Sequence, residues 1–451
     1  MNETRRLAEF MVETGYQDLP AHFIEAVRVY ILDDFAAGCA GARTPWSDMV
    51  AGLVRESSVG ECTIFGRDWT TSPAAAALIN GVAVGGFEVD HPFTPGSCHP
   101  SGAVFPAALA VAERRHCSGR DFLTAVATGY ELLCRVGLAA TRAVEDVRGF
   151  HGPGTNSAFG AAAASGKLLG FDAHTLNQAL GIAGSHGGGL VEFHHEGAMT
   201  KRLHLGRGSQ MGVECALLAQ RGFTGPSTVL EGSHGFLHAY SPAPKVERLT
   251  ERLGEHWESA AMVLKAYPCH ISFHAVIDGL RAFRHQHAFS AADIERIRIV
   301  GSKRMMEDRH SDPAPTTLMG AQYSLPWSAG IALTADVADP RIWVNLDFAD
   351  AAVARLAAMV ERQEDSERFG QPGGPAAEVT LTVAGTGHTL VVTDWKGAPS
   401  NPYSYADITG KFLRYADGVL TPDRANEVVR RVARLEDEGD MAELARLIRH
   451  E

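Results

Sequence analysis

The chain has 451 residues, of which 45% are hydrophobic, and a formal net charge of −12. This length and composition exclude fibrous and disordered proteins and predict a globular protein of two or three domains, at about 150 residues per domain. The acidic balance, with a pI near 5.9, argues against nucleic acid as a partner but is compatible with a local basic pocket for a small anion. Seven scattered cysteines without CxxC spacing, a charged N-terminal segment and the lack of a long uncharged apolar run predict a reduced, cytoplasmic protein that does not enter a membrane.

Apolar residues recur at spacings of three and four through most of the first 260 residues, which is typical of helices with one buried face. Ala and Gly are abundant in these segments. Because small residues let helix axes approach closely, the pattern predicts a tightly packed all-helical domain. The expected helices span residues 20–40, 101–116, 121–142, 157–169, 174–185 and 205–221.

The pattern changes after Lys265, where β-branched residues alternate or cluster as they do in strands. Strands are expected at 294–302, 377–385 and 388–394, and a helix is expected at 349–362. The last two strands are expected to form a hairpin across Thr386 and Gly387. This part of the chain is therefore predicted to be α+β.

The tail from Tyr403 returns to a helical period and is expected to pack back on the first domain. The predicted fold is mainly α, with a large all-helical domain built from both chain ends and an inserted α+β lid domain. The helical domain is assigned to residues 1–264 and 396–451, and the lid to residues 265–395.

A Gly/Pro-rich loop between two apolar helices carries acids and bases close together. Glu88, Asp90, His91 and His99 fall within twelve residues of one another. Loops held between rigid helices often carry catalytic acids and bases. The alternative is a solvated connector whose carboxylates cap the next helix, with Ser101 as its N-cap. The spacing leaves both interpretations open.

Two further segments are candidates for an anion site, although an ordinary loop histidine is the favoured interpretation of the first. His151 lies in a Gly/Pro loop immediately before a helix, whose N-terminus favours bound anions, although an ordinary loop histidine fits the same pattern. Lys201, Arg202 and His204 cluster at the start of another apolar helix. Charge clusters usually face solvent, but this one lies among small residues, so an anion site is the favoured interpretation.

Lys265, His270 and His274 lie where the helical pattern gives way to the mixed one, and domain junctions are favoured places for pockets. A histidine pair four residues apart can bind a metal. Without the Glu of an HExxH motif or a nearby Cys pair, we expect no metal. The chain also lacks a nucleotide-binding glycine loop and a GxSxG elbow, so its side chains are expected to carry the chemistry without a cofactor.

Short motifs occur in a characteristic order along most of the chain. They are NGVA with EVD and HPSGAV, GYEL…R, GFH, TKRLH, GFTGPSTVLEG, LKAYPCH, AQYSLPW and GAPSNP…KF. In this order and content the chain resembles the 2-methylcitrate dehydratase (MmgE/PrpD) family. The resemblance implies a helical domain from both chain ends, an inserted lid and a homodimer. It also implies chemistry on a small di- or tricarboxylate without a metal or organic cofactor.

The resemblance also implies roles for individual residues. Those it places in catalysis are Glu88, Asp90, His99 and Lys265. Its cationic pocket falls on His151, Lys201 and Lys265. The residues that we expect to bind substrate are His151, Lys201, Arg202, His204, His270, Tyr130 and Arg135. The division is physically reasonable, because fixed cations neutralise substrate carboxylates and stabilise developing charge, while a carboxylate and a histidine move protons.

The chain departs from the family pattern at three places, one of which is an insertion of two residues before His99, in TPGSC. It reads EVDHP at residues 88–92 where the family commonly reads D-F-D-D-[TS], and Trp327 stands where the decarboxylase branch has Tyr. The departures leave three functions open. A lyase would eliminate water or carbon dioxide from a polycarboxylate of the 2-methylcitrate or aconitate type. An epimerase or isomerase would return a proton to a dicarboxylate such as iminodisuccinate, and a non-catalytic protein would only bind carboxylates.

Overall fold

The computed structural model describes residues 2–287, 289–371, 374 and 376–450 and divides the chain into two compact units. Unit 1 comprises Met1–Glu192, Met199–Leu264 and Tyr403–Glu451, and unit 2 comprises Phe193–Ala198 and Lys265–Pro402. The predicted mainly α class is confirmed. The sequence placed residues 193–198 and 396–402 with the helical domain, whereas the structure groups them with unit 2.

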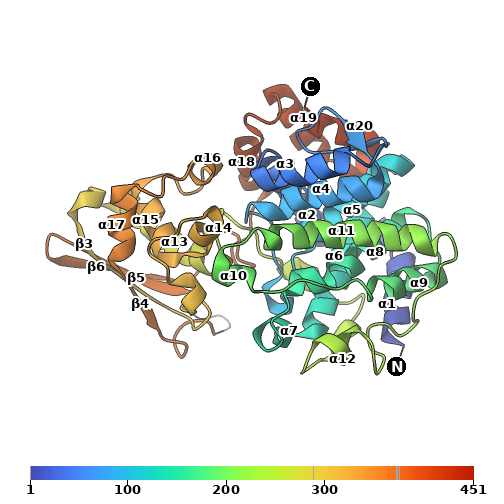
Figure 1. Ribbon diagram of the computed structural model, residues 1–451, viewed down its shortest axis with the longest axis horizontal. Coiled ribbons are helices and arrows are strands. Elements are labelled where there is room, and N and C mark those ends of the chain that lie inside the picture. The colour runs from blue at the N-terminus through green and yellow to red at the C-terminus, as the bar shows by residue number, and fades with distance from the viewer. Residues whose placement is uncertain (1, 288, 372–373, 375, 451) are drawn as a thin grey trace. The chain divides into compact units, whose positions relative to one another are not determined.

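In its described residues, unit 1 is built from helices and one short antiparallel ribbon (Figure 1). Its helices are α1 (Glu3–Glu13), α2 (Ala21–Gly41), α3 (Pro45–Arg55), α4 (Pro73–Gly86), α5 (Pro100–Arg115), α6 (Gly119–Ala140), α7 (Ala143–Asp146), α8 (Gly152–Leu168), α9 (Ala173–Ala183), α11 (Thr200–Ala219), α12 (Phe236–Tyr240), α18 (Tyr405–Ala416), α19 (Pro422–Val432) and α20 (Met441–Ala445). The ribbon pairs β1 (Cys62–Thr63) with β2 (Thr70–Thr71) and departs from the all-helical expectation. The six helices expected from apolar spacing are present, with their ends shifted by a few residues.

Helix α11 packs against α4 and α8 at the centre of unit 1 (Figure 1). Gly81 of α4 meets Gly206 of α11, and a Cβ on Gly81 would lie only 2.7 Å from the Cα of Gly206. Real side chains do not tolerate such a distance, so this crossing requires glycine. The close approach fixes the start of α11 relative to the end of α4, and Glu88 follows directly after α4.

The apolar core of unit 1 gathers side chains from α1, α6, α8, α9 and α11, including Leu7, Leu132, Phe159, Leu180 and Cys215. Helix α6 is long and apolar enough by composition to cross a membrane. However, 94% of its most apolar window is buried inside the protein. This burial is typical of the core helix of a globular unit.

Two helices from the C-terminal part of the chain pack against a helix near its N-terminus. Both α18 and α19 pack against α2, as the red and blue segments in Figure 1 show. Ser404 starts α18 as its N-cap by accepting a hydrogen bond from the backbone N–H of Asp407, and the Asp407 carboxylate accepts the N–H of Ser404 in return. This capping box begins the helix directly after unit 2 ends at Pro402.

Unit 2 contains a four-stranded mixed sheet in the order β4-β3-β5-β6. The strands are β3 (Ile294–Gly301), β4 (Val360–Glu364), β5 (Ala377–Val383) and β6 (Thr386–Val392). The helices are α10 (Phe193–Glu196), α13 (His274–Gln286), α14 (Leu318–Tyr323), α15 (Leu325–Thr334), α16 (Pro340–Val344) and α17 (Ala351–Ala358). Strand β3 runs parallel to β4 and antiparallel to β5, with Ile297 opposite Val360 and Leu381. Helix α13 packs on β5 and β6, which buries the apolar face of the sheet.

Two expectations for unit 2 are wrong in detail. The helix expected over 349–362 ends at Ala358, and the chain continues as β4, which pairs with β3. The hairpin between β5 and β6 turns at Ala384 and Gly385 rather than at Thr386 and Gly387. Both turn residues have positive φ, 49° and 73°. The two-residue hairpin loops that match the twist of paired strands use this conformation.

Candidate active site

A histidine–aspartate pair joins the loop after α4 to the start of α5. Nδ1 of His99 lies 2.5 Å from Oδ2 of Asp90. The Asp90 side chain is fully buried, whereas that of His99 is 17% exposed. His99 occupies the N-cap position of α5, and Pro100 follows at the first helical position. Because Nδ1 is held by Asp90, Nε2 is the nitrogen placed for proton exchange with a substrate.

Glu88 and Lys201 form a buried ion pair between the same loop and α11. Nζ of Lys201 donates to Oε1 of Glu88, and the side chains are 6% and 1% exposed. Glu88 has φ of +61°, a left-handed conformation that non-glycine residues seldom adopt. An ammonium has three N–H donors, so its bond to Glu88 does not exclude a bond to a second carboxylate.

Arg202, the next residue on α11, holds the end of α4. Its guanidinium donates to the carbonyl oxygen of Gly86 and lies 3.8 Å from the ring centroid of Trp46. The side chain is buried at 3% exposure. These contacts tie Arg202 to the end of α4, and its role in substrate binding stays a prediction.

His151 and His204 form a pair between the first turns of α8 and α11. Their Nδ1 atoms lie 2.9 Å apart, so one imidazole donates and the other accepts. Burial, and then the nearby Lys201 charge, lowers the pKa of His204 to about 4. His204 is therefore neutral at pH 7. The imidazole whose Nδ1 accepts this bond carries its proton on Nε2, so the pair offers a hydrogen-bond donor to a ligand without requiring two adjacent positive charges.

The N-termini of three long helices converge around these residues. His151 starts α8 and contacts His204 in the first turns of α11. Gly152, the first residue of α8, packs against the carbonyl oxygen of Ser97, two residues before the His99 cap of α5. Helix N-termini carry a partial positive charge, so this arrangement favours a bound anion.

A fully buried polar network lies behind the dyad, between α2, α5 and α6. Asp34 of α2 accepts hydrogen bonds from the Tyr130 and Ser101 hydroxyls. Nδ1 of His91 lies 3.2 Å from Oδ2 of Asp33 and 3.7 Å from Oδ1 of Asp34. Tyr130, expected to bind substrate, thus belongs to the supporting network. Ser101 serves this network instead of capping α5, a position that His99 occupies.

Burial controls the protonation of this network. It raises the pKa of Asp34 to about 7, against the opposing effects of His91 and the two hydroxyl donors. Burial alone would lower the pKa of His91, but the charges of Asp34 and Asp33 outweigh it and raise that pKa. Burial, followed by the Asp34 charge, raises the pKa of Tyr130 well above its usual value. Tyr130 is therefore a permanent hydrogen-bond donor at physiological pH.

Sequence reasoning missed Asp33, Asp34 and Lys411. Nζ of Lys411, on α18, lies 2.5 Å from Oδ1 of Asp33. The available signal was the adjacent pair of aspartates inside the otherwise apolar segment YILDDFAAG, since charged residues are rarely buried without partners. Nothing local indicates Lys411 as the partner, because 378 positions separate it from Asp33.

Arg135 lies apart from the other candidates of unit 1. Its side chain is fully buried, and Nε donates to Glu131 at 2.6 Å. The other two nitrogens donate to the carbonyl oxygens of Glu251 and His256 at 2.8 and 2.7 Å. These bonds tie α6 to the 251–256 loop. They give Arg135 a structural position that differs from the substrate-binding role we expected.

Lys265 and His270 belong to unit 2. Lys265 is buried at 2% exposure. The His270 ring lies 4.4 Å from the fully buried ring of His310 and 5.2 Å from that of Tyr323. Burial, and then the neighbouring His310, lowers the pKa of His270 well below its usual value, so the imidazole is neutral. Nδ1 of His274 accepts the backbone N–H of Ala266 at 3.4 Å.

Comparison with known proteins identifies the family. The MmgE/PrpD N-terminal domain model matches residues 5–249, and the MmgE/PrpD C-terminal domain model matches residues 267–437. The first match alone covers more than half of the chain. The chain belongs to the MmgE/PrpD family.

Curated relatives in this family match almost end to end. A cis-aconitate decarboxylase-like protein oryM of Aspergillus oryzae is 28% identical over 99% of this chain and 97% of its own length. The cis-aconitate decarboxylases of Mus musculus and Homo sapiens are also 28% identical. They cover 93% and 94% of this chain, and 88% and 90% of their own lengths.

The departures from the MmgE/PrpD pattern have structural counterparts. His91, within the altered EVDHP segment, is the residue that contacts both Asp33 and Asp34. Trp327 lies in the first turn of α15 and is 1% exposed. Across the described ranges, no group of three or more His, Cys, Asp or Glu side chains is arranged to hold a metal ion.

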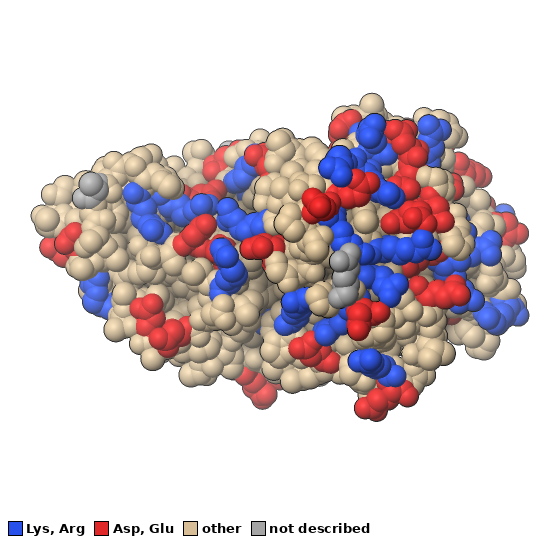
Figure 2. Space-filling view, turned by 90° about the horizontal axis from the view of Figure 1, so that it is seen from above, with Lys and Arg blue, Asp and Glu red and all other residues tan. Residues whose placement is uncertain are grey.

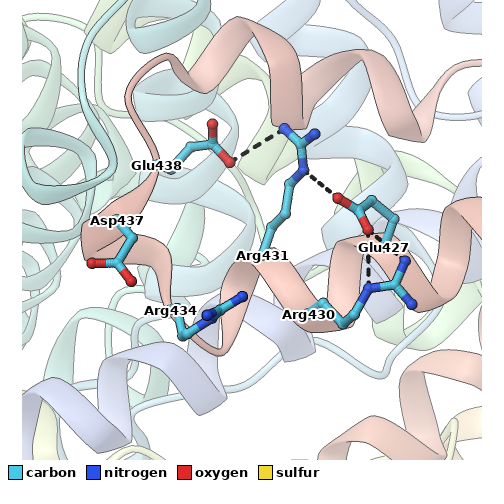
Figure 3. Close-up of a pocket in the computed structure, with 6 residues that line it drawn as sticks. All are labelled: Glu427, Arg430, Arg431, Arg434, Asp437 and Glu438. Atoms are coloured by element: carbon cyan, nitrogen blue, oxygen red, sulfur yellow. Dashed lines mark hydrogen bonds and ion pairs between the residues drawn. The ribbon is translucent and has the colours of Figure 1, made fainter.

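A surface pocket of unit 1 lies elsewhere and has different chemistry. Acidic and basic side chains are interspersed on the face shown in Figure 2. The pocket in Figure 3 has a volume of about 280 Å³, and its lining residues are Glu427, Arg430, Arg431, Arg434, Asp437 and Glu438. Its three arginines face three carboxylates, and Glu427 already binds two of the arginines. This balance gives an anionic substrate no net attraction, so we place the candidate site at the dyad.

Proposed function

We propose that the protein is a lyase that acts on a small polycarboxylate and moves protons with its own side chains. Decarboxylation of a substrate of the cis-aconitate type is the reaction to test first. The observation that carries the proposal is the Asp90–His99 dyad, with a buried carboxylate orienting a partly exposed imidazole. The names of the family relatives support the decarboxylase assignment.

The surroundings of the dyad suit a substrate with several carboxylates. Lys201 supplies a buried cation, the His151–His204 pair supplies a hydrogen-bond donor, and three helix N-termini add partial positive charge. The roles of Lys265 and His270 remain predictions from the family resemblance. The homodimer implied by the resemblance also remains a prediction.

The proposed chemistry balances without another reactant. In decarboxylation, a C–C bond of the substrate breaks and one carboxylate leaves as carbon dioxide. The electron pair of that bond stays on the substrate, where neighbouring cations stabilise the developing charge. A proton from Nε2 of His99 then neutralises the carbanion, and Asp90 stabilises the imidazolium before that transfer. In a dehydration, His99 instead accepts the proton next to a carboxylate as hydroxide departs.

Proton NMR in D₂O tests the proposal with a panel of hydroxy, amino and unsaturated di- and tricarboxylates that includes cis-aconitate, 2-methylcitrate and iminodisuccinate. New vinyl signals with loss of a group from the substrate support the lyase. Deuterium that enters an otherwise unchanged skeleton would instead establish an epimerase or isomerase. Thermal stabilisation by a panel member without turnover would identify a carboxylate-binding protein and overturn the lyase proposal.

A matched pair of variants tests the dyad itself. His99→Ala is expected to lower kcat by at least ~10²-fold, the usual scale for a positioned acid or base. His116→Ala is the control, because His116 also pairs with an aspartate, Asp440, at 2.8 Å, but lies at the surface with 63% of its side chain exposed. Its kcat is expected to stay at the wild-type value. Full activity in His99→Ala would contradict the proposed role of the dyad.

A further inference from the structure

Lys411 contacts the backbone of the candidate active-site loop. Its Nζ lies 3.1 Å from the carbonyl oxygen of Val89, in addition to its 2.5 Å contact with Oδ1 of Asp33. The side chain is only 7% exposed. Val89 stands between Glu88 and Asp90, so Lys411 donates to the backbone that joins the two carboxylates.

This part of the loop holds its two acidic side chains in different environments. Glu88 is directed to Lys201 of α11, and Asp90 to His99 at the start of α5. Between them, the chain passes through the left-handed conformation of Glu88. Such a conformation costs about 1–3 kcal/mol in a non-glycine residue and persists only when its surroundings enforce it. A rotation of the peptide at Val89 would move both carboxylates.

The same carboxylate of α2 holds the other end of the loop. Oδ2 of Asp33 lies 3.2 Å from Nδ1 of His91, while Oδ1 accepts from Lys411. Asp33 thereby links helix α18 to His91, the residue that follows Asp90. Side chains from three different helices therefore contact the loop. Lys201 of α11 binds Glu88, Lys411 of α18 binds the Val89 carbonyl, and Asp33 of α2 contacts His91.

We infer that Lys411 is a positioning residue for the proposed reaction. It fixes the Val89 carbonyl and thereby sets the geometry of the Asp90–His99 dyad without touching the substrate. The inference rests on the proposed function, because it concerns turnover at that dyad. A competing role is purely electrostatic, in which Lys411 serves only to neutralise the fully buried Asp33.

Single variants give the first part of the test. Lys411→Met is expected to lower kcat by at least ~10²-fold, as displacements of about 1 Å do, while KM changes by less than about threefold. Lys411→Arg keeps a donor and is expected to stay within about tenfold of the wild-type kcat. Arg414→Met, on the exposed side of the same helix, is the control and should leave both constants unchanged.

A double variant separates positioning from charge neutralisation. Lys411→Met alone leaves the buried Asp33 with the His91 imidazole but without the ammonium, and should lower Tm. Asp33→Asn combined with Lys411→Met removes both charges, so Tm should return toward the wild-type value. The Val89 carbonyl still lacks its donor, however, so kcat should remain at least ~10²-fold low.

Each outcome of these assays decides the inference. A folded double variant with wild-type kcat would overturn it, as would full activity in Lys411→Met. Failure of both the single and the double variant to fold would assign Lys411 to stability and overturn it equally. Absence of turnover in the wild-type protein would refute the proposed function. This result is distinguishable from failure of the Lys411 inference, because the wild-type protein is assayed before any variant is compared with it.

Discussion

Replacing Asp34 with Asn is expected to flatten the dependence of folding stability on pH. Asp34 is fully buried within the network behind the dyad and accepts hydrogen bonds from Tyr130 and Ser101. Asn has nearly the same shape and can both donate and accept, but it does not ionise. The substitution therefore tests the proton on this side chain with little change in packing.

The structure sets the size and sign of the effect. Burial raises the pKa of Asp34 from 3.8 to about 7, so the folded state keeps a proton that the unfolded state loses between these pH values. The stability linked to this proton is fully present below the unfolded pKa and is lost as pH rises through the folded one. At about 1.4 kcal/mol per pH unit, the interval of about three units gives a loss of about 4 kcal/mol.

His91 acts in the same direction. Once ionised, Asp34 is the largest effect that raises the pKa of His91, and Asp33 adds to it, so the folded state also binds the imidazole proton more tightly than the unfolded state does. That stabilisation is likewise lost as pH rises. Asp34→Asn removes the first effect and weakens the second, so both changes flatten the curve.

Urea unfolding followed by circular dichroism, at pH values from about 4 to 8, measures the effect. Wild-type protein is expected to lose several kcal/mol of unfolding free energy across this range, and Asp34→Asn much less. Glu25→Gln is the control, because Glu25 lies on the same helix with 72% of its side chain exposed, and its slope should match the wild type. An unchanged slope in Asp34→Asn would refute the assigned protonation.

Three further predictions follow from the contacts. Asp90→Asn should lower kcat by about 10²-fold with little change in KM, measured by steady-state kinetics, because the imidazole loses its carboxylate partner. Lys201→Met should cost about 3–5 kcal/mol in urea unfolding, because it leaves Glu88 buried without its cation, and a cost below about 1 kcal/mol would contradict the burial. Gly206→Ala should lower the free energy of unfolding by about 1–3 kcal/mol, because its Cβ would clash with α4. Gly410→Ala is the control and should not destabilise the protein, because a Cβ there would meet open space.

Helices whose apolar residues recur at helical spacing were predictable from the sequence. Residues 20–40 and 101–116 correspond to α2 and α5 within a residue or two, because apolar residues at helical spacing run through both segments. The expectation of one buried face was wrong for α5, whose residues from Pro100 to Glu113 are all buried. Strand β4 was not predictable, since VERQE has no strand pattern and becomes a strand by pairing with β3. The turn at 384–385 was missed although Gly385 was a usable signal.

The same distinction applies to the candidate site. The Asp90–His99 contact joins residues nine positions apart within one loop, so proximity in sequence was a sufficient guide. Asp33 meets His91 across 58 positions. Such contacts depend on how helices pack, which no local pattern encodes. Sequence reasoning therefore selected the Asp90–His99 pair, to which we assign proton exchange, and missed Asp33 and Lys411, which contact its loop.

The contact between Asp33 and Lys411 has a consequence for how the protein is made. A ribosome that adds about 5–20 residues per second needs about 20–80 s to travel the 378 positions between them. For that time Asp33 and Asp34 are already synthesised, but the ammonium that neutralises Asp33 is not. All of unit 2 emerges during the same interval. The helical unit therefore reaches its final state only near the end of translation, and a nascent chain stalled before residue 403 would carry the dyad residues without the helix that secures their loop.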